Sequence, residues 1–288
     1  MADPNTLLFY LKKSTEFLEK KGIPTPRVDA EWILSDLLNL PRIKLYAQFE
    51  MPLGTTEITT YRERIVERGK NKPVAYIIGK KGFHRFDFFV NEHVLIPRPE
   101  TEELVDYVFK NKESLFGENQ NSQILDLCTG SGCIGLSLTK LIPNSSVFLS
   151  DISEAAILVA KTNAKNLEVD SKVQFFHSNL FEEIPLELKF DLIVSNPPYI
   201  PVSEKSEIMD DVLLYEPHLA LFVEDFVSFH RTLVTGCFNK IKENGTCILE
   251  THPNLIQTLI SIVKEVGFTK SEIIKDSSGK DRFLIFQK

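Results

Sequence analysis

The residues with the most distinctive chemistry are Asn196, Pro197, Pro198 and Tyr199, which follow the apolar segment 191–195. A planar amide or amino nitrogen is a weak nucleophile, because its lone pair is delocalised into the adjacent π-system. The side-chain carbonyl of Asn196 and the backbone carbonyl of Pro197 can accept hydrogen bonds from the two N–H groups of such a nitrogen. Each proline holds φ near about −65° and has no N–H of its own, so these acceptors are oriented in advance. The segment therefore predicts transfer of a group to a planar nitrogen.

Tyr199 adds an aromatic face to this segment. Its ring can stack on the planar group and attract a cationic donor through a cation–π interaction. The segment contains no general base, so we expect the proton of the product to leave to water after the transfer. A proline-rich loop that merely ends a buried strand is the alternative interpretation, and the glycine-rich segment upstream argues against it.

That glycine-rich segment, Ile124 to Gly135, contains the pattern GxGxxG at Gly130, Gly132 and Gly135. It follows a predicted strand and begins a predicted helix, and Asp151 ends the next predicted strand about 20 residues later. Glycines let the backbone approach a ligand closely, and an acid at this distance binds the two hydroxyls of a ribose. The pattern predicts a nucleoside cofactor.

Two cofactor classes fit this segment. Dinucleotides place a pyrophosphate at the helix N-terminus, whereas S-adenosyl-L-methionine carries an ammonium group and no phosphate. Asp126 lies near the mouth of the predicted strand, where a carboxylate would repel a pyrophosphate and attract an ammonium group. This residue favours S-adenosyl-L-methionine as the cofactor.

Seven predicted strands, most of them separated by predicted helices, follow one another through the rest of the chain. This order predicts an α/β fold with a mainly parallel sheet, covered by helices on both faces. The loop 275–281 before the last strand is too short for a helix, so we expect that strand to be antiparallel. Asn196 then lies at the carboxyl end of the fourth strand, where open α/β sheets bind ligands. The predicted strands are 124–127, 147–150, 173–176, 192–195, 246–250, 271–274 and 283–287.

We expect three parts along the chain. Apolar residues at helical spacing, interrupted by prolines, predict a helical domain over residues 1–72. Residues 73–97 resemble a β-hairpin linker, and residues 98–288 form the catalytic domain. Within the linker we expect strands at 74–78 and 83–90 around a turn at 79–82.

The charge of the 288-residue chain is unevenly distributed. Residues 1–85 contain 15 Lys and Arg against 10 Asp and Glu, whereas the remaining residues contain 18 against 30. An acidic catalytic part is a poor platform for a long polyanion, so we expect no stable complex with nucleic acid. The basic first part suits RNA or an acidic protein surface, although a purely solvating role explains it equally well.

No apolar segment reaches the roughly 18–20 residues that cross a bilayer, and the first residues show no secretory or transit pattern. We therefore expect a cytoplasmic protein without membrane contact, and we expect it to be a monomer. None of the four cysteines forms a CxxC pair, so we expect buried thiols rather than metal ligands or disulfides.

Longer motifs join these segments into a resemblance that covers nearly the whole chain. The run Pro97-Arg-Pro-Glu-Thr-Glu102 is the most distinctive, because Asn-Pro-Pro-Tyr also occurs in DNA and rRNA amino-methyltransferases. With these motifs the chain resembles the PrmC/HemK family, which methylates the side-chain N5 of the glutamine in the Gly-Gly-Gln motif of peptide chain release factors. The other motifs that carry the resemblance lie at 27–31, 73–77, 83–88, 126–132, 151, 196–199, 215–221 and 278–282.

The resemblance implies a Rossmann-like S-adenosyl-L-methionine-dependent methyltransferase whose small N-terminal helical domain binds the release factor. It implies that Asn196, Pro197, Pro198 and Tyr199 hold the glutamine. Asn196, Pro197 and Tyr199 would be catalytic, and Asn196 would also lie near the methyl group of the cofactor. The expected cofactor-binding residues are Asp126, Cys128, Thr129, Gly130, Ser131, Gly132, Asp151, Asn179, Leu180 and Asn196.

Two segments depart from the usual pattern of the family. After the third strand the family usually has Gly-Asp and a bulky residue, where this chain has Ser178, Asn179 and Leu180. The side-chain oxygen of Asn179 can still accept a hydrogen bond from the adenine amino group. An Asp-Gly-Leu run of the family is replaced by residues 225–227, which lack the glycine and leave the geometry of that turn open.

Arg98 and Glu100 allow two interpretations. The resemblance suggests that they cover the active site. A proline at position 99 followed by acids is equally typical of the start of a helix.

Three alternative functions share these motifs. One is glutamine methylation of a ribosomal protein, and another is methylation of an adenine or guanine amino group in DNA or rRNA, where a flipped base presents the same planar nitrogen. The third is a catalytically inactive binding module. The acidic catalytic part and the lack of a recognisable nucleic-acid module argue against the second, and the intact Asn-Pro-Pro-Tyr segment argues against the third.

Overall fold

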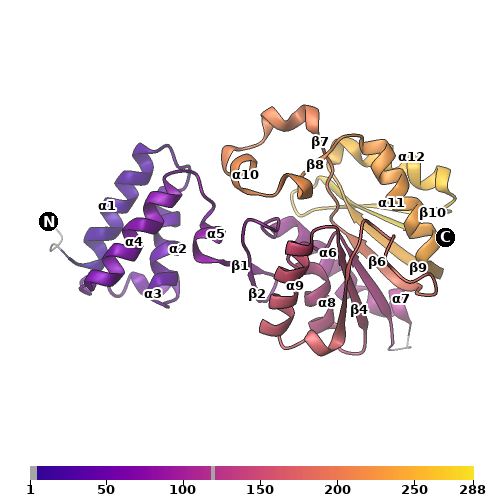
Figure 1. Cartoon of the computed structure of the whole chain (residues 1–288), viewed down its shortest axis with the longest axis horizontal. Helices are drawn as coiled ribbons and strands as arrows, with labels where there is room; N and C mark the ends of the chain where they lie inside the picture. The colour runs from indigo at the N-terminus through magenta and orange to yellow at the C-terminus, as the bar shows by residue number, and fades with distance from the viewer. Residues whose placement is uncertain (1–4, 118–120) are drawn as a thin grey trace. The chain divides into compact units, whose positions relative to one another are not determined.

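Helices form the first of two units in the chain (Figure 1). The structure, a computed structural model, describes residues 5–117 and 121–288. The first unit extends to Lys80 and also includes Met209–Tyr215. Its helices are α1 (Leu7–Lys20), α2 (Pro26–Leu37), α3 (Arg42–Leu45), α4 (Thr55–Arg68), α5 (Val74–Ile78) and α10 (Asp210–Tyr215).

The helix α2 carries the side chains that join the helices of the first unit. It begins at Pro26, whose fixed φ suits the first helical position. Ala30, Ile33 and Leu34 are fully buried among side chains of α1 and α4. Complete burial of each Ile or Leu contributes roughly 1.5–3 kcal/mol to the free energy of unfolding, so α2 is central to this core.

The motif at residues 27–31 holds α2 in place. Asp29 is buried, and its Oδ2 accepts a hydrogen bond of 2.7 Å from Nε of Arg68, which is also buried. Glu31 accepts a hydrogen bond of 2.7 Å from the hydroxyl of Tyr46. A buried carboxylate without partners would cost several kcal/mol, so these two acids fix the positions of α3 and α4 against α2.

The strand predicted at residues 74–78 is wrong, because these residues form the helix α5. A short apolar run fits a strand or one buried helical turn equally well. The helix ends at Gly79, whose φ of 68° suits glycine. The hairpin lies further along the chain than predicted and consists of β1 (Lys80–Phe83) and β2 (Phe86–Phe89). Its turn therefore falls at residues 84 and 85.

A seven-stranded sheet forms the centre of the second unit, as predicted. Its strands are β3 (Gln123–Leu127), β4 (Ser146–Asp151), β5 (Val173–His177), β6 (Phe190–Ser195), β9 (Ile241–Glu250), β10 (Lys270–Lys275) and β11 (Asp281–Gln287). The strand order is β10-β11-β9-β6-β3-β4-β5. The last strand, β11, is antiparallel to both neighbours, which confirms the predicted topology.

Helices cover both faces of this sheet (Figure 1). The first face packs on α11 and α12, and the second face packs on α6 and α8. A two-stranded sheet pairs β7 (Ile200–Pro201) with β8 (Phe222–Val223). The helices are α6 (Pro99–Lys110), α7 (Lys112–Phe116), α8 (Cys133–Leu141), α9 (Glu154–Asn166), α11 (Phe226–Lys240) and α12 (Ile256–Val266). None of the helices in the described ranges is long and apolar enough to span a membrane.

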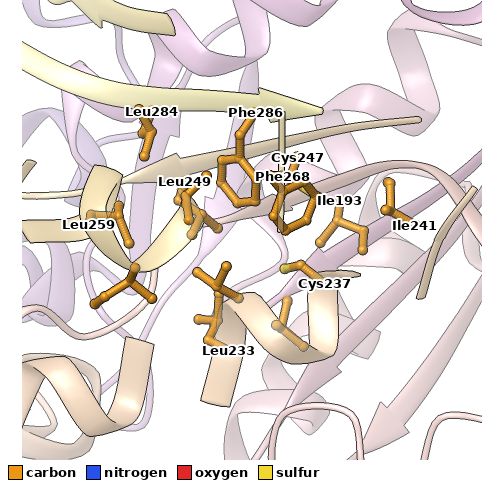
Figure 2. Close-up of a cluster of buried hydrophobic side chains, with 14 of the residues drawn as sticks. Ile193, Leu233, Cys237, Ile241, Cys247, Leu249, Leu259, Phe268, Leu284 and Phe286 are labelled. Carbon is orange, nitrogen blue, oxygen red and sulfur yellow. The ribbon is translucent and has the colours of Figure 1, made fainter. Parts of the chain in front are cut away.

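Alternate residues of each strand enter two separate cores. Ile193 of β6 and Cys247 and Leu249 of β9 are buried in the core beside α11 and α12, as Figure 2 shows. Val194 and Ile248, one residue further along each strand, belong to the core on the opposite face. This is the period of two that strand side chains follow.

The same alternation sets the direction of the polar residues at the carboxyl ends of the strands. Asp126 follows Ile124 by two residues, and Glu250 follows Ile248 by two, so both acids point to the face covered by α6 and α8. Asn196, directly after β6, contacts α6 on this face as well. Three polar side chains therefore lie under the first turns of α6 and α8.

Candidate active site

The glycine-rich segment forms a tight loop between β3 and α8. Gly130 and Gly132 have φ values of 55° and 81°, in the left-handed region that suits glycine. Cys128 lies in the same region with a φ of 58°. The N–H of Gly132 donates to the carbonyl of Thr129 at 2.8 Å, and α8 begins directly afterwards. The loop is therefore folded by its own backbone conformation and hydrogen bonds.

Asp126 lies underneath this loop and is completely buried. Its Oδ2 accepts hydrogen bonds from Oγ1 of Thr129 at 2.6 Å and from the N–H of Gly135 at 2.8 Å. Burial raises the pKa of Asp126 to about 7. The carboxyl group braces the loop from below and does not line the cavity above it.

Asp151, at the end of β4, lies beside the loop. Its Oδ2 accepts a hydrogen bond of 2.8 Å from the N–H of Gly130, and its Oδ1 accepts one of 2.9 Å from the N–H of Ser153. Each carboxylate oxygen has a second lone pair, so both retain the capacity to accept a bond from a ligand. Burial raises the pKa of Asp151.

The segments that follow β4 and β5 contribute three residues to the cavity wall. Asn179 and Leu180 line it as predicted residues, and Ile152, which the sequence reasoning missed, lines it with 46% of its surface exposed. The signal for Ile152 was its place directly after Asp151. The Nδ2 of Asn179 donates to Oε1 of Glu182 at 3.0 Å, and no hydrogen bond within the described ranges involves its side-chain oxygen Oδ1.

Asn196 lines the cavity next to the glycine-rich loop. Its Nδ2 donates a hydrogen bond of 3.3 Å to Oγ1 of Thr101, the third residue of α6. Among the residues that the structure describes, its carbonyl oxygen Oδ1 has no hydrogen-bond partner. Asn196 therefore has a bound donor end and an available acceptor end.

The other three residues of the tetrapeptide have different surroundings. Pro198 lines the cavity, whereas Pro197 is buried and Tyr199 packs on the core beside α11 and α12, and neither lines it. Burial raises the pKa of Tyr199 to about 12, so its hydroxyl stays protonated at neutral pH.

Thr101 and Glu250 are functional candidates that the sequence reasoning missed. The hydroxyl of Thr101 donates to Oε2 of Glu250 at 2.7 Å, and both residues are 2% exposed. Thr101 belongs to the most distinctive motif of the chain, and Glu250 ends a predicted strand. Neither signal indicated that the two side chains meet, because they are 149 residues apart in the sequence.

Arg98 fits both interpretations made from the sequence. It immediately precedes α6, with a proline at the first helical position and Glu100 in the first turn. It also lines the cavity, and its Nη2 donates to Oε1 of buried Glu216 at 2.7 Å. The second oxygen of Glu216 accepts a bond of 3.1 Å from the N–H of Ile96. Two motifs distant in sequence, 97–102 and 215–221, are thus joined at the cavity wall.

Asn163 of α9 is a further side chain that the sequence reasoning missed. Its Oδ1 accepts a bond of 2.7 Å from the N–H of Phe89, and its Nδ2 donates to the carbonyls of Phe89 at 3.0 Å and Ser131 at 2.9 Å. The amide therefore ties β2 and the glycine-rich loop to α9. No local pattern announces it, because Asn163 and Phe89 are 74 residues apart.

The turn at residues 225–227, where the chain lacks the glycine of the related pattern, begins α11. The carboxylate of Asp225 accepts bonds from the N–H groups of Val227 at 2.9 Å and Ser228 at 3.1 Å. An aspartate at this position satisfies the unpaired N–H groups of a helix start, so the turn needs no glycine.

One cavity brings most of the predicted site residues together. Its wall is mainly apolar, and Arg98 and Asp151 supply charged groups of opposite sign. The hydroxyl of Ser131 in this wall is buried and has no hydrogen-bond partner within the described ranges. Of the predicted residues, Cys128, Thr129, Gly130, Ser131, Asp151, Asn179, Leu180, Asn196 and Pro198 line the cavity, whereas Asp126, Gly132, Pro197 and Tyr199 do not.

Two family models match the chain. The model described as the PrmC N-terminal domain matches residues 10–79, and the model described as the methyltransferase small domain matches residues 112–215. The first match lies in the helical unit, and the second begins at α7 and includes the glycine-rich loop and the tetrapeptide.

Several curated proteins are similar over most of the chain. A release factor glutamine methyltransferase of Leptospira interrogans is 52% identical over 99% of both chains. One of Flavobacterium psychrophilum is 38% identical over 88% of both chains. A bifunctional methyltransferase of Rickettsia conorii is 37% identical over 96% of this chain, which spans 56% of that longer protein.

Solved structures share the fold at low sequence identity. A T. thermophilus 16S rRNA methyltransferase in complex with AdoMet and guanosine has a TM-score of 0.52 and 18% identity, and the match covers 73% of this chain and 49% of that chain. A Pyrococcus furiosus methyltransferase has a TM-score of 0.50 and 19% identity, with 79% of this chain and 98% of that chain covered. These similarities concern the arrangement of the sheet and its helices.

Proposed function

The chain belongs to the release factor glutamine methyltransferase family, and from this premise we propose that it methylates the side-chain N5 of the glutamine in the Gly-Gly-Gln motif of peptide chain release factors. The observation that carries the proposal is Asn196 in the wall of the cavity, with its carbonyl oxygen available to an N–H group. A glutamine side chain offers two such N–H bonds on a planar nitrogen.

The methyl donor proposed for this site is S-adenosyl-L-methionine, which when bound supplies an electrophilic methyl group on a sulfonium. The side chains of the cavity fit this molecule. Asp151 has acceptor capacity for the ribose hydroxyls, and Ile152 and Leu180 offer apolar surface to a base. The unpartnered hydroxyl of Ser131 can bond a polar group of the cofactor. We assign Asp126 to bracing the loop, because its carboxyl group does not line the cavity.

The substrate nitrogen would be oriented by two carbonyl groups. We assign these to the side chain of Asn196 and the backbone of Pro197, while Pro198 forms part of the wall. Fixed acceptors lower the barrier to transfer because they hold the nitrogen in a reactive orientation. With a pKa of about 12, Tyr199 remains protonated at neutral pH and is no base for the reaction. The proton therefore leaves to water after the methyl group has been transferred.

The helical first unit is the proposed binding site for the body of the release factor. Residues 1–85 contain 15 Lys and Arg against 10 Asp and Glu, so this part carries an excess of positive charge. Such an excess favours an acidic protein surface and accelerates association.

Mass spectrometry of a release factor incubated with the enzyme and S-adenosyl-L-methionine tests the function. We expect one added methyl group on the glutamine of the Gly-Gly-Gln motif, with a ribosomal protein and rRNA present as competing substrates. Asn196→Ala is the control, and its methyl transfer should fall much more than its cofactor affinity, since it loses an acceptor used at the reacting nitrogen. Methylation of the ribosomal protein or the rRNA in place of the release factor would refute the proposal.

A further inference from the structure

A buried line of three polar side chains ends at Asn196. The amide Nδ2 of Asn196 donates to Oγ1 of Thr101 at 3.3 Å, and this hydroxyl donates to Oε2 of Glu250 at 2.7 Å. The residues come from three elements: the segment after β6, the first turn of α6, and the end of β9. They meet because the even-numbered positions of both strands face α6.

We propose that Thr101 and Glu250 are positioning residues that decide which end of the Asn196 amide is presented to the substrate. The inference rests on the proposed function, because it assigns the carbonyl oxygen of Asn196 to the N–H of the substrate. It concerns side chains that touch Asn196, directly or through each other, and that take no part in the transfer themselves.

The direction of the hydrogen bonds follows from the inventory of donors. A threonine hydroxyl has one hydrogen, and an ionised carboxylate can only accept. Thr101 must therefore give its hydrogen to Glu250 and can only accept from Asn196. Asn196 meets this requirement with its Nδ2, so its Oδ1 is left at the opposite end of the amide.

The hydrogen bond between Thr101 and Glu250 is the stronger of the two and sets the direction of the other. The bond to Glu250 is the shorter of the two, at 2.7 Å against 3.3 Å, as expected for an ionised acceptor. Thr101 and Glu250 are each 2% exposed, so water does not compete for the hydroxyl. The orientation of the Asn196 amide is thus determined by the protein.

Protonation of Glu250 reverses the direction of both hydrogen bonds. A protonated Glu250 can donate to Thr101, and the hydroxyl of Thr101 then has its own hydrogen free for Oδ1 of Asn196. The amide turns over and presents Nδ2 to the substrate N–H, so that two donors oppose each other. No covalent bond changes in this step; one proton is taken up from solvent.

The surroundings of Glu250 bring this reversal into the neutral range. Burial raises the pKa of Glu250 to about 7. The positive charges of Arg282 and Arg98 favour the ionised form, and the negative charge of Glu100 opposes it. The charged and titratable groups that interact electrostatically with Glu250 are Arg98 directly before α6, Glu100 in its first turn, Arg282 from β11, Tyr199 after β6 and Cys133 from α8.

Steady-state kinetics with a Gly-Gly-Gln peptide, together with calorimetric cofactor affinity, test the role of Thr101. Thr101→Val removes the hydroxyl at nearly constant shape, and we expect kcat to fall about 10²-fold with unchanged cofactor affinity, because the amide loses its fixed orientation. Thr101→Ser keeps the hydroxyl and should restore most of kcat.

Thr246→Val is the matched control. Oγ1 of Thr246, on the same strand as Glu250, accepts a bond of 2.8 Å from Nε2 of Gln287, so this variant loses a hydroxyl–amide bond of the same kind away from the cavity. We expect a lower melting temperature and an unchanged kcat.

The pH profile of kcat tests Glu250. The active form has Glu250 ionised, so kcat of the wild type should decline as the pH falls through about 7. Glu250→Gln should remove this decline and lower kcat, because a glutamine amide can both donate to Thr101 and accept from it.

Three results would overturn the inference while leaving the proposed function intact: an active Thr101→Val, a Thr101→Ser as slow as Thr101→Val, or an acid decline that persists in Glu250→Gln. The serine and glutamine variants keep the test valid even if the valine variant does not fold. A wild-type chain that transfers no methyl group to the peptide or to the release factor would instead overturn the proposed function, and the inference with it.

Discussion

Gly135, in the first turn of α8, has no room for a side chain. A β-carbon there would lie 2.9 Å from Oδ2 of Asp126 and 3.2 Å from a methyl carbon of Leu149. We predict that Gly135→Ala lowers the free energy of unfolding by about 1–3 kcal/mol, since neither buried neighbour has room to move. Urea denaturation measures this loss.

Ser137→Ala is the control for Gly135→Ala in the same helix. Ser137 is completely buried, and its hydroxyl has no hydrogen-bond partner within the described ranges. Removing an unsatisfied hydroxyl should leave the free energy of unfolding unchanged or slightly higher. Equal losses in both variants would contradict the steric explanation.

Asp126 makes the stability of the chain depend on pH. Burial raises its pKa to about 7, whereas an aspartate in an unfolded chain titrates near about 3.9. Between these values the folded chain keeps a proton that the unfolded chain releases. The contribution of Asp126 to the free energy of unfolding is therefore complete below about pH 4 and is lost as the pH rises to about 7.

We predict that Asp126→Asn flattens this dependence, by up to about 1.4 kcal/mol per pH unit. The single acceptor oxygen of an asparagine can still serve Thr129 and Gly135, so the loop should remain folded. Denaturant titrations at about pH 5 and about pH 7 give the comparison. If the free energy of unfolding changed equally with pH in wild type and variant, burial of Asp126 would not cause the pH dependence.

At the scale of elements, the hairpin of β1 and β2 depends on one side chain of α9. Asn163 bonds the N–H and the carbonyl of Phe89 as a neighbouring strand would, and it also bonds the carbonyl of Ser131. We predict that Asn163→Ala lowers the free energy of unfolding by roughly 2–4 kcal/mol, because buried backbone groups lose their partners. The loss is measured by thermal or urea denaturation.

The same substitution should weaken cofactor binding, because Ser131 lies in the cavity wall. Asn166→Ala is the matched control, since Asn166 lies one turn further along α9 and is exposed. If the two variants were equally stable, the amide of Asn163 would not be the link between these elements.

Local sequence patterns predicted the strands of the sheet well. All seven strands of the sheet were predicted from apolar runs and their flanking turns, and β11 was predicted antiparallel from a short loop. The segment 74–78 was predicted wrongly, since one helical turn and one short strand share the same apolar pattern.

The candidate site divides in the same way. The glycine-rich loop, Asp151 and Asn196 were predictable because their residue types stand at fixed distances along the chain. The partnership of Thr101 with Glu250 was not, because it arises only when α6 lies across β9. Pairings between distant residues depend on the packed fold, and no spacing in the sequence encodes them.

At the scale of the whole molecule, the two units have separate proposed tasks. We predict that a chain without residues 1–80 still binds S-adenosyl-L-methionine, because every residue that lines the cavity belongs to the second unit. Its methylation of an intact release factor should fall by more than about tenfold, since a lost docking surface easily removes 1.4 kcal/mol of binding.

The discriminating measurement is kcat/KM with two substrates. The full and the shortened chain should methylate a short Gly-Gly-Gln peptide with similar kcat/KM. Only the kcat/KM for the intact release factor should fall in the shortened chain. Equal losses on both substrates would mean that the first unit supports the catalytic site rather than the partner.

The membership of α10 in the first unit has a consequence for the order of events during synthesis. The hydroxyl of Tyr215 donates to the carbonyl of Lys70 at 2.7 Å, and Met209–Tyr215 are grouped with the residues up to Lys80. A ribosome therefore finishes most of the first unit long before it produces the segment that completes it. The first unit therefore lacks α10 while β3 to β6 are synthesised. Its final closure is a late, long-range step, of the kind that slows folding and lengthens the exposure of a nascent chain to chaperones.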